Sequence, residues 1–496
     1  MAPVNLGPMT EQGTSGADAG PWARFAALAA VIALAAALVA ALVAADDPGE
    51  PAVDLSGGAL EDDPFAYEDA RRGEFEARAA AGVAHVLYAN SPGGVTETAR
   101  MVTRYRDEIE RATAGSQVDP DVLEAIVFLE SAGRSQVIAG GDPEGAAGLT
   151  QIVASTATSL LGMRVDLEQS TRLTRQINRA YEFGQAERAE RLTAERARID
   201  ERFDPEAALA GAVRYLTEAR GRFGSDELAV VSYHMGIGNL ENVISTYVSE
   251  EPDADPVAIP YAELYFNSSP LDHPATWDLL SSFGDESSEY LWKVRAAEGI
   301  LRLYRNDPEA LGELEALHAA KATGEEAFHP LDETDSFADS GELADAWNSG
   351  EVVPIPESPE LGYAIDEGMG RLAGDLGADP ALYRGLRPEA VAALIYLAGL
   401  TSEVNGGGAL RLTSAVRDGS YQDLLSARNP QATDDYSLHT TGWSFDIARD
   451  YESDAQAEAF QFALDRLQAL ALIDYAVEPG AIHVTVSNEI GPLLRG

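Results

Sequence analysis

The chain has 496 residues, and its 35 basic and 82 acidic side chains give a formal net charge of −47. This length corresponds to two or three domains at roughly 150 residues each, and an apolar content of 45% excludes a wholly disordered chain. The charge argues against a nucleic-acid partner, because phosphate binding needs clustered lysine and arginine, and the absence of cysteine excludes disulfides, cysteine nucleophiles and thiolate metal sites.

The first predicted element is a transmembrane helix over residues 25–45, which contain neither a charge nor a proline. A helix needs about 20 apolar residues to cross a bilayer. Arg24 precedes the run and two aspartates follow it, so the positive-inside rule places residues 1–24 in the cytoplasm. We therefore expect a single-pass membrane protein with its ectodomain outside the cell membrane, in the periplasm or on the wall side. A cleaved signal peptide and a buried alanine-rich helix are the alternatives.

Composition divides the rest of the chain into four regions. Residues 46–94 are expected to form a stalk, 95–306 a mainly helical domain, 307–359 an acidic linker, and 360–496 an α+β domain with short alternating strands. Alternating Glu and Arg at about 170–203 indicate a solvated helical insertion in the helical domain. The expected fold class is multidomain, with a transmembrane helix, a mainly α domain and a C-terminal α+β domain.

A glutamate near the end of an apolar helix is the first candidate for chemistry. Asp119 and Pro120 are typical of a helix start, and Leu123, Val127 and Glu130 share one face of the helix that follows. An acid on an apolar stripe near a helix C-terminus has a raised pKa, as a general acid needs near neutral pH. The alternative is an ordinary surface glutamate.

Further blocks follow this helix in order: EGAAGLTQIVASTA, DPEAALAGAVRYL and AVVSYHMGIGN. Together they resemble the soluble lytic transglycosylases of bacterial cell walls, which have a goose-lysozyme-like fold. The resemblance implies that Glu130 is the single catalytic acid and base, and that Ser131, Gln151 and Tyr233 line the sugar groove. His234 stands where the family has Asn, and we expect it to donate a hydrogen bond there; Thr150 replaces a Met.

The resemblance also implies a reaction. Glycosidases that hydrolyse generally use two carboxylates, whereas lytic transglycosylases use one glutamate twice. It protonates the glycosidic oxygen between N-acetylmuramic acid and N-acetylglucosamine, then deprotonates the muramic 6-hydroxyl, which closes a 1,6-anhydro ring. Peptidoglycan is then the substrate, and this domain needs no metal or other cofactor.

The C-terminal domain contains a possible three-ligand metal site. In GWSFDIA the residue Asp446 alternates with apolar residues, and in AIHVTVS the residue His483 does the same, so both side chains leave the apolar face of a strand. With His439 they could form a zinc site with one open position. Surface or structural histidines are the alternative.

The spacing from Ser437 through His439 to Asp446 resembles the zinc D-Ala-D-Ala carboxypeptidases and their hedgehog/lysostaphin-type relatives. The resemblance implies Zn at His439, Asp446 and His483, substrate contact by Ser437, and binding of a substrate carboxylate by Arg417. The usual catalytic base is missing, because Gly480 and Ala481 occupy its positions. An active peptidase and a module that only binds peptide stems are both left open, with Glu478 the nearest acid.

The sequence therefore predicts a membrane-anchored peptidoglycan lytic transglycosylase whose second domain binds or trims stem peptides. A zinc peptidase with a degenerate lysozyme-like domain and a non-catalytic wall-binding scaffold are the rival hypotheses. Nothing in the sequence identifies a protein partner.

Overall fold

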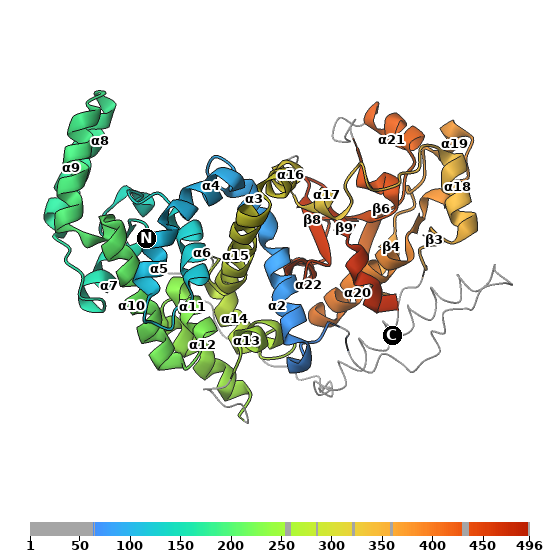
Figure 1. Ribbon diagram of the computed structural model, residues 1–496. Coiled ribbons are helices and arrows are strands. Elements are labelled where there is room, and N and C mark those ends of the chain that lie inside the picture. The colour runs from blue at the N-terminus through green and yellow to red at the C-terminus, as the bar shows by residue number, and fades with distance from the viewer. Residues whose placement is uncertain are drawn as a thin grey trace, which may run out of the picture.

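The computed structural model describes residues 63, 65–252, 259–283, 286–319, 323–357, 361–428 and 436–494. These residues form a mainly helical domain, followed by a second domain built around a mixed sheet (Figure 1).

The helical domain consists of helices and one very short hairpin. Its helices are α2 (Arg72–Gly82), α3 (Ala84–Asn90), α4 (Val95–Val102), α5 (Arg106–Thr113), α6 (Pro120–Ser131), α7 (Ala154–Ser159), α8 (Leu167–Glu182), α9 (Ala186–Ile199), α10 (Pro205–Phe223), α11 (Asp226–Met235), α12 (Ile237–Glu250), α13 (Tyr261–Asn267), α14 (Pro274–Ser282), α15 (Tyr290–Asn306) and α16 (Pro308–Ala319). The hairpin pairs β1 (Ala146–Ala147) with β2 (Ile152–Val153).

Helices α6 and α15 lie at the centre of this domain, and they contact each other. Helix α6 begins as the sequence predicts, because the Asp119 carboxylate accepts a hydrogen bond from the Asp121 backbone N–H and Pro120 is the first helical residue. It ends at Ala132, whose left-handed φ of 52° breaks the helical path. Glu130 therefore sits in the last turn of an otherwise largely buried helix.

Helices α8 and α9 form a hairpin that projects from the domain (Figure 1). The hairpin coincides with the predicted helical insertion. Its tip exposes Tyr181 and Phe183, and its base is closed by a buried hydrogen bond from Ser170 to Asp200.

The second domain is built on a five-stranded sheet of order β4-β6-β7-β9-β8, in which only β4 and β6 are parallel. The strands of this sheet are β4 (Tyr363–Ile365), β6 (Leu410–Ser414), β7 (Ser444–Ala448), β8 (Ile473–Val477) and β9 (Ala481–Val486), and β3 (Val353–Pro354) pairs with β5 (Gly385–Leu386) in a separate two-stranded sheet. The helices of this domain are α17 (Glu325–Phe328), α18 (Ser340–Ser349), α19 (Ala373–Leu376), α20 (Pro388–Asn405), α21 (Gly419–Ser426) and α22 (Asp454–Ala469).

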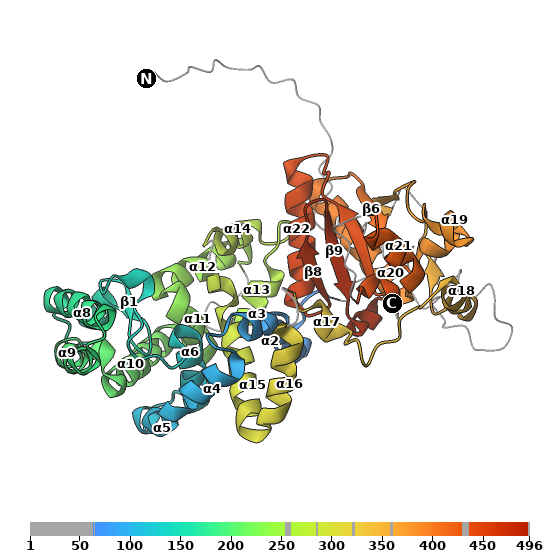
Figure 2. The same ribbon diagram turned by 90° about the horizontal axis from the view of Figure 1, so that it is seen from above.

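One face of this sheet is apolar and the other carries polar groups. The apolar side chains of β7 and β9, such as Phe445 and Val484, are buried, and the long helices α20 and α22 pack together beside the sheet (Figure 2). The register pairs Asp446 directly with His483. Because side chains alternate along a strand, both groups leave the sheet on the side opposite Phe445 and Val484.

The two domains pack directly against each other. Phe65 and Tyr396 meet edge to face with ring centroids 5.7 Å apart, and Arg466 donates to the Phe266 carbonyl at 3.1 Å. Helices α2 and α22 approach so closely that a Cβ on Gly82 would lie 2.4 Å from the Gln468 carbonyl oxygen. One continuous hydrophobic core therefore runs through both domains.

The expected membrane-anchored architecture requires correction. No helix among the described residues is both long enough and apolar enough to cross a bilayer, and the predicted span at 25–45 lies outside the described residues, as does the predicted cytoplasmic tail at 1–24. The predictions of a single-pass anchor and of a cell-membrane localisation are therefore withdrawn.

Two predicted boundaries also differ from the structure. The second half of the predicted stalk, residues 46–94, forms α2 and α3, which pack on α15. The predicted linker, residues 307–359, contains α16, α17 and α18 and contributes buried side chains. Acidic surface residues lower the apolar content of these stretches, although each of their helices buries at least one side chain.

Candidate active site and candidate metal centre

Glu130 lines a cavity of about 320 Å³ in the helical domain. The side chain is half-buried, and its neighbours along the cavity wall include Phe128, Leu129 and Leu87. Burial raises the pKa of Glu130 to about 7, and a hydrogen bond from Tyr290 partly offsets that rise. The carboxyl group is thus poised to hold or release a proton near neutral pH.

Tyr290 is the partner of this carboxyl group, and the sequence interpretation did not identify it. Its hydroxyl donates to Glu130 Oε1 at 2.7 Å from the first residue of α15. Its ring stacks with the rings of Tyr233, at 6.5 Å between centroids, and His234, at 5.0 Å. The tyrosine opens an apolar helix 160 residues away from Glu130, and no local pattern distinguishes it from a core residue.

The structure brings some of the predicted groove residues to the cavity and leaves others beside it. Ser131 and His234 line the cavity with Glu130. The Ser131 hydroxyl donates to the Val127 carbonyl at 3.2 Å and is nearly inaccessible, whereas His234 is exposed and contacts Ser287 through Nδ1 at 2.9 Å.

Gln151 and Tyr233 shape the loop next to the cavity instead. Gln151 has a left-handed φ of 47°, and its side-chain amide donates to the Gly148 carbonyl at 2.7 Å. The Tyr233 hydroxyl donates to the Thr150 carbonyl at 2.8 Å. Both side chains therefore fix the backbone of residues 148–151.

A fully buried arginine, Arg202, binds the backbone on both sides of this loop. Arg202 pairs with Asp200 at 2.8 Å and donates to the carbonyls of Pro143, Gly145 and Ile152. The contact is so close that a Cβ on Gly148 would lie 1.7 Å from the Arg202 carbonyl oxygen. The glycine is therefore required there by space as well as by its φ of 81°.

In the second domain, His439, Asp446 and His483 converge as the strand pattern predicted. Their ligand atoms all lie within 4.8 Å of one another. The Asp446 Oδ1 atom lies 3.2 Å from His439 Nε2 and 2.8 Å from His483 Nδ1.

In each imidazole, the ring nitrogen that points away from Asp446 faces an acceptor oxygen. His439 Nδ1 lies 2.8 Å from the Ala415 carbonyl oxygen, which can only accept, so Nδ1 carries the proton and Nε2 keeps its lone pair. His483 Nε2 lies 3.5 Å from Glu325 Oε1, which leaves Nδ1 facing Asp446. Burial, with Arg417 next, lowers the pKa of His439 to about 4, so the ring is neutral at physiological pH. The donor set therefore fits a divalent metal such as zinc.

Glu325 is a second residue that the sequence interpretation missed. It belongs to the stretch expected to be a linker, yet its side chain is buried and accepts hydrogen bonds from Thr323 at 2.8 Å and Thr485 at 2.9 Å. The chain that connects the domains thus places a carboxylate behind a candidate metal ligand.

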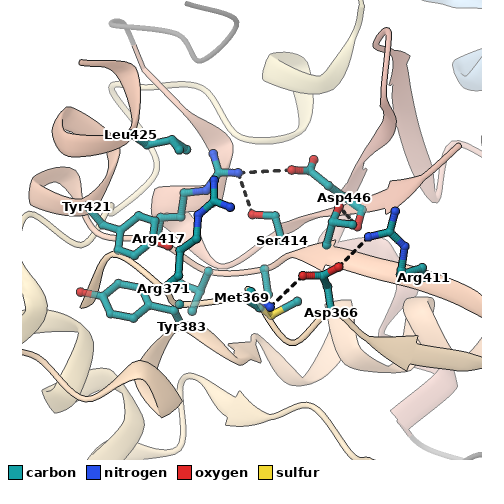
Figure 3. Close-up of a pocket in the computed structure, with 15 residues that line it drawn as sticks. Asp366, Met369, Arg371, Tyr383, Arg411, Ser414, Arg417, Tyr421, Leu425 and Asp446 are labelled. Atoms are coloured by element: carbon teal, nitrogen blue, oxygen red, sulfur yellow. Dashed lines mark hydrogen bonds and ion pairs between the residues drawn. The ribbon is translucent and has the colours of Figure 1, made fainter. Parts of the chain in front are cut away.

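The predicted substrate contacts of this domain take different positions. Arg417 lines a cavity of about 350 Å³ that also reaches Asp446 (Figure 3). Ser437 is buried at the start of the turn that carries His439 and does not line that cavity. Glu478 lies in the turn between β8 and β9, and its pKa is raised by partial desolvation and by Asp446.

The comparison with protein families agrees with the first site. The family model of the transglycosylase SLT domain matches residues 107–186 and 181–255. The two matched ranges meet at the tip of the α8–α9 hairpin, and together they include Glu130, the β1–β2 loop and Tyr233. No curated protein and no solved structure matches the chain. Residues 107–255 thus carry a transglycosylase SLT domain, which supports a lyase that acts on peptidoglycan, while the resemblance of residues 360–496 to zinc carboxypeptidases stays a prediction.

Proposed function

We propose that the helical domain is a lytic transglycosylase that cleaves the bond between N-acetylmuramic acid and N-acetylglucosamine and leaves 1,6-anhydro ends. The observation that carries this proposal is the Glu130 carboxyl group, which has a pKa of about 7, lines a cavity of the helical domain and belongs to the residues that the family model matches. Such a group can act as an acid in one step and as a base in the next.

The proposed reaction uses Glu130 twice. The protonated carboxyl group gives its proton to the glycosidic oxygen as the C1–O bond breaks, and the acetamido group of the substrate stabilises C1. The carboxylate then removes the proton of the muramic 6-hydroxyl as the C1–O6 bond forms. Tyr290 donates to the carboxylate between these steps and limits the rise of its pKa. Glu130 is protonated again at the end, and no water is consumed.

A second carboxylate, Glu286, lines the same cavity. A glycosidase that hydrolyses would need such a group as nucleophile or base. Glu286, however, is exposed and forms an ion pair with Lys293 at 2.6 Å. We therefore assign it no proton-transfer role.

Peptidoglycan digestion followed by mass spectrometry tests this assignment. We expect the wild-type protein and Glu286→Gln to release anhydro-muropeptides and Glu130→Gln to release none. If Glu286→Gln loses all activity and the wild-type products have reducing ends, a two-carboxylate hydrolase would replace the proposal.

We further propose that the C-terminal domain holds one zinc ion at His439, Asp446 and His483 and binds or trims stem peptides. The geometry of the three ligand atoms and the tautomer of His439 support this second function. A bound zinc would act as a Lewis acid toward a peptide carbonyl. Cleavage also needs a base, and Gly480 and Ala481 supply none, so binding without cleavage agrees equally well with the residues present.

Metal analysis tests the second function independently of catalysis. The purified protein should contain about one zinc per chain, which three protein ligands and one open position can hold. The double variant His439→Ala, His483→Ala should contain none. Equal metal content in the two proteins would remove zinc from the account and leave the transglycosylase proposal untouched.

A further inference from the structure

The tip of the α8–α9 hairpin carries two exposed aromatic side chains. The exposed fraction is 60% for Tyr181 and 70% for Phe183, and no other phenylalanine, tyrosine or tryptophan among the described residues is exposed to that degree. Contact of so much apolar surface with water is unfavourable. Aromatic side chains are also enriched where proteins contact each other. The tip therefore has the character of a contact surface for another molecule.

The helix that leads to this tip is basic on its outer face. Arg172, Arg175 and Arg179 are exposed on the side of α8 opposite its buried residues, and their guanidinium groups make no hydrogen bond or ion pair with any residue of the described ranges. Glu182 is the only acid between Arg172 and Phe183. In a chain with a formal net charge of −47, such a surface favours an acidic partner.

A cavity of about 430 Å³ on the same chain is lined by aromatic rings. It lies where α14 of the helical domain meets α22 of the second domain (Figure 2). The rings of Tyr265, Trp277 and Phe462 line it, and those of Trp277 and Phe462 meet edge to face across the domain boundary with centroids 5.8 Å apart. Rings favour edge-to-face and offset contacts with other rings, so this cavity suits an aromatic side chain.

The same cavity has an excess of negative charge. Glu289, Glu458 and Asp465 line it, together with a single guanidinium group, that of Arg466. Arg466 already forms an ion pair with Asp63 at 3.8 Å and donates to two backbone carbonyls. Glu458 is exposed and has no hydrogen-bond or ion-pair partner among the described residues. A guanidinium group that enters the cavity beside a ring would therefore find a free carboxylate.

The tip and the cavity also match in the spacing of charge and ring. Arg179 precedes Phe183 by four residues at the end of α8, and Glu458 precedes Phe462 by four residues within α22. The Phe183 backbone N–H donates to the Arg179 carbonyl at 3.2 Å, so one helical turn of about 5.4 Å separates charge from ring on both helices. In both views the hairpin lies at the end of the helical domain remote from α22, so a tip does not reach the cavity of its own chain (Figures 1 and 2).

We infer that the tip of the α8–α9 hairpin docks into this cavity on a second copy of the chain, with Phe183 among the rings and Arg179 against Glu458. The contact joins two different surfaces, so it is heterologous. Each pair of chains keeps a free tip at one end and a free cavity at the other, and further copies can add there. The inference does not depend on either proposed reaction.

Sedimentation equilibrium of the full chain over a range of concentrations tests the inference. The average mass of the wild-type protein should rise above that of one chain as the concentration increases, whereas Phe183→Ser and Glu458→Lys should each remain at the mass of one chain. Arg179→Gln keeps the ring but loses a charge-assisted contact, so its dissociation constant should rise about tenfold. An equimolar mixture of Phe183→Ser and Glu458→Lys should reach the mass of two chains and stop there, because it contains one intact tip and one intact cavity per pair.

Leu331→Ser is the matched control, because Leu331 is 64% exposed and belongs neither to the tip nor to the cavity lining. It should associate as the wild-type protein does. The inference is wrong if the wild-type protein stays at the mass of one chain at every concentration, or if Phe183→Ser associates as the wild-type protein does. Single chains in the mixture would also overturn it, because the tip would then meet a surface other than this cavity. Binding of single wild-type chains to anionic lipid vesicles through Phe183 would replace the second copy with a lipid surface.

Discussion

At the scale of single residues, the hydrogen bond from Tyr290 to Glu130 limits the proton affinity of the proposed acid. The hydroxyl stabilises the carboxylate form, so it lowers a pKa that burial raises. Tyr290→Phe removes this bond but keeps the ring that stacks on His234. Because the acid must be protonated to start the reaction, activity should fall as the pH rises through the pKa of Glu130.

We expect Tyr290→Phe to move this alkaline limb of the pH–rate profile upward by about 0.5 to 1 pH unit, the equivalent of one hydrogen bond. The profile is measured by product release from peptidoglycan between pH 5 and pH 9. Tyr215→Phe is the control, since the Tyr215 hydroxyl donates to the Ser232 carbonyl and does not reach Glu130. A downward shift, or the same shift in both variants, would contradict the role given to Tyr290.

Glu325 makes a residue-scale prediction for the metal centre. A carboxylate behind a metal-bound imidazole orients the ring and increases its basicity, and its loss typically lowers metal affinity 10- to 100-fold. Glu325→Gln should therefore weaken zinc binding by about 10- to 100-fold in a competition assay with a chelating dye. The exposed Glu333 lies in the same stretch of chain, so Glu333→Gln should not change the affinity. Unchanged affinity in Glu325→Gln would show that His483 needs no support from this carboxylate.

At the scale of elements, the β1–β2 loop depends on the buried pair of Arg202 and Asp200. Arg202→Met leaves a buried carboxylate without its partner and three carbonyl groups without a donor. Such a change costs about 3–5 kcal/mol of unfolding free energy. The apparent melting temperature should fall clearly, and transglycosylase activity should fall with it.

Arg164→Met provides the comparison, because Arg164 pairs with Glu201 on the surface of the same region. Exposed pairs contribute about 0–1 kcal/mol, so this variant should melt close to the wild-type protein. Equal melting temperatures for the two variants would show that the Arg202 network does not hold the loop.

Elements were predictable from the sequence where the signal was local. The cap and proline at Asp119 and Pro120 fixed the start of α6, and the alternation around Asp446 and His483 placed both side chains on one face of the sheet. Tyr290 and Glu325 were not predictable, because each acts on a residue 158 or more positions away. Such contacts depend on how distant segments pack together, and neither the periodicity nor the composition of a sequence predicts that packing.

At the scale of the whole molecule, the two candidate sites belong to domains that share one continuous hydrophobic core. The proposed ligands of both sites are parts of one polymer, peptidoglycan. The large negative charge opposes adhesion to an anionic wall, so contacts within the sites must supply the affinity. Binding of Glu130→Gln to wall sacculi should therefore persist when salt is raised from about 0.05 M to 0.5 M, where charges are strongly screened. Collapse of binding at high salt in a pelleting assay would show that bulk electrostatic attraction dominates.

The most direct test of the central claim is digestion of peptidoglycan in water enriched in oxygen-18, with mass spectrometry of the products. If Glu130 acts alone and the muramic 6-hydroxyl attacks C1, the wild-type products should be anhydro-muropeptides without the label, and Glu130→Gln should yield none. Reducing ends that carry oxygen-18 would contradict the account, because they would show that water attacks C1.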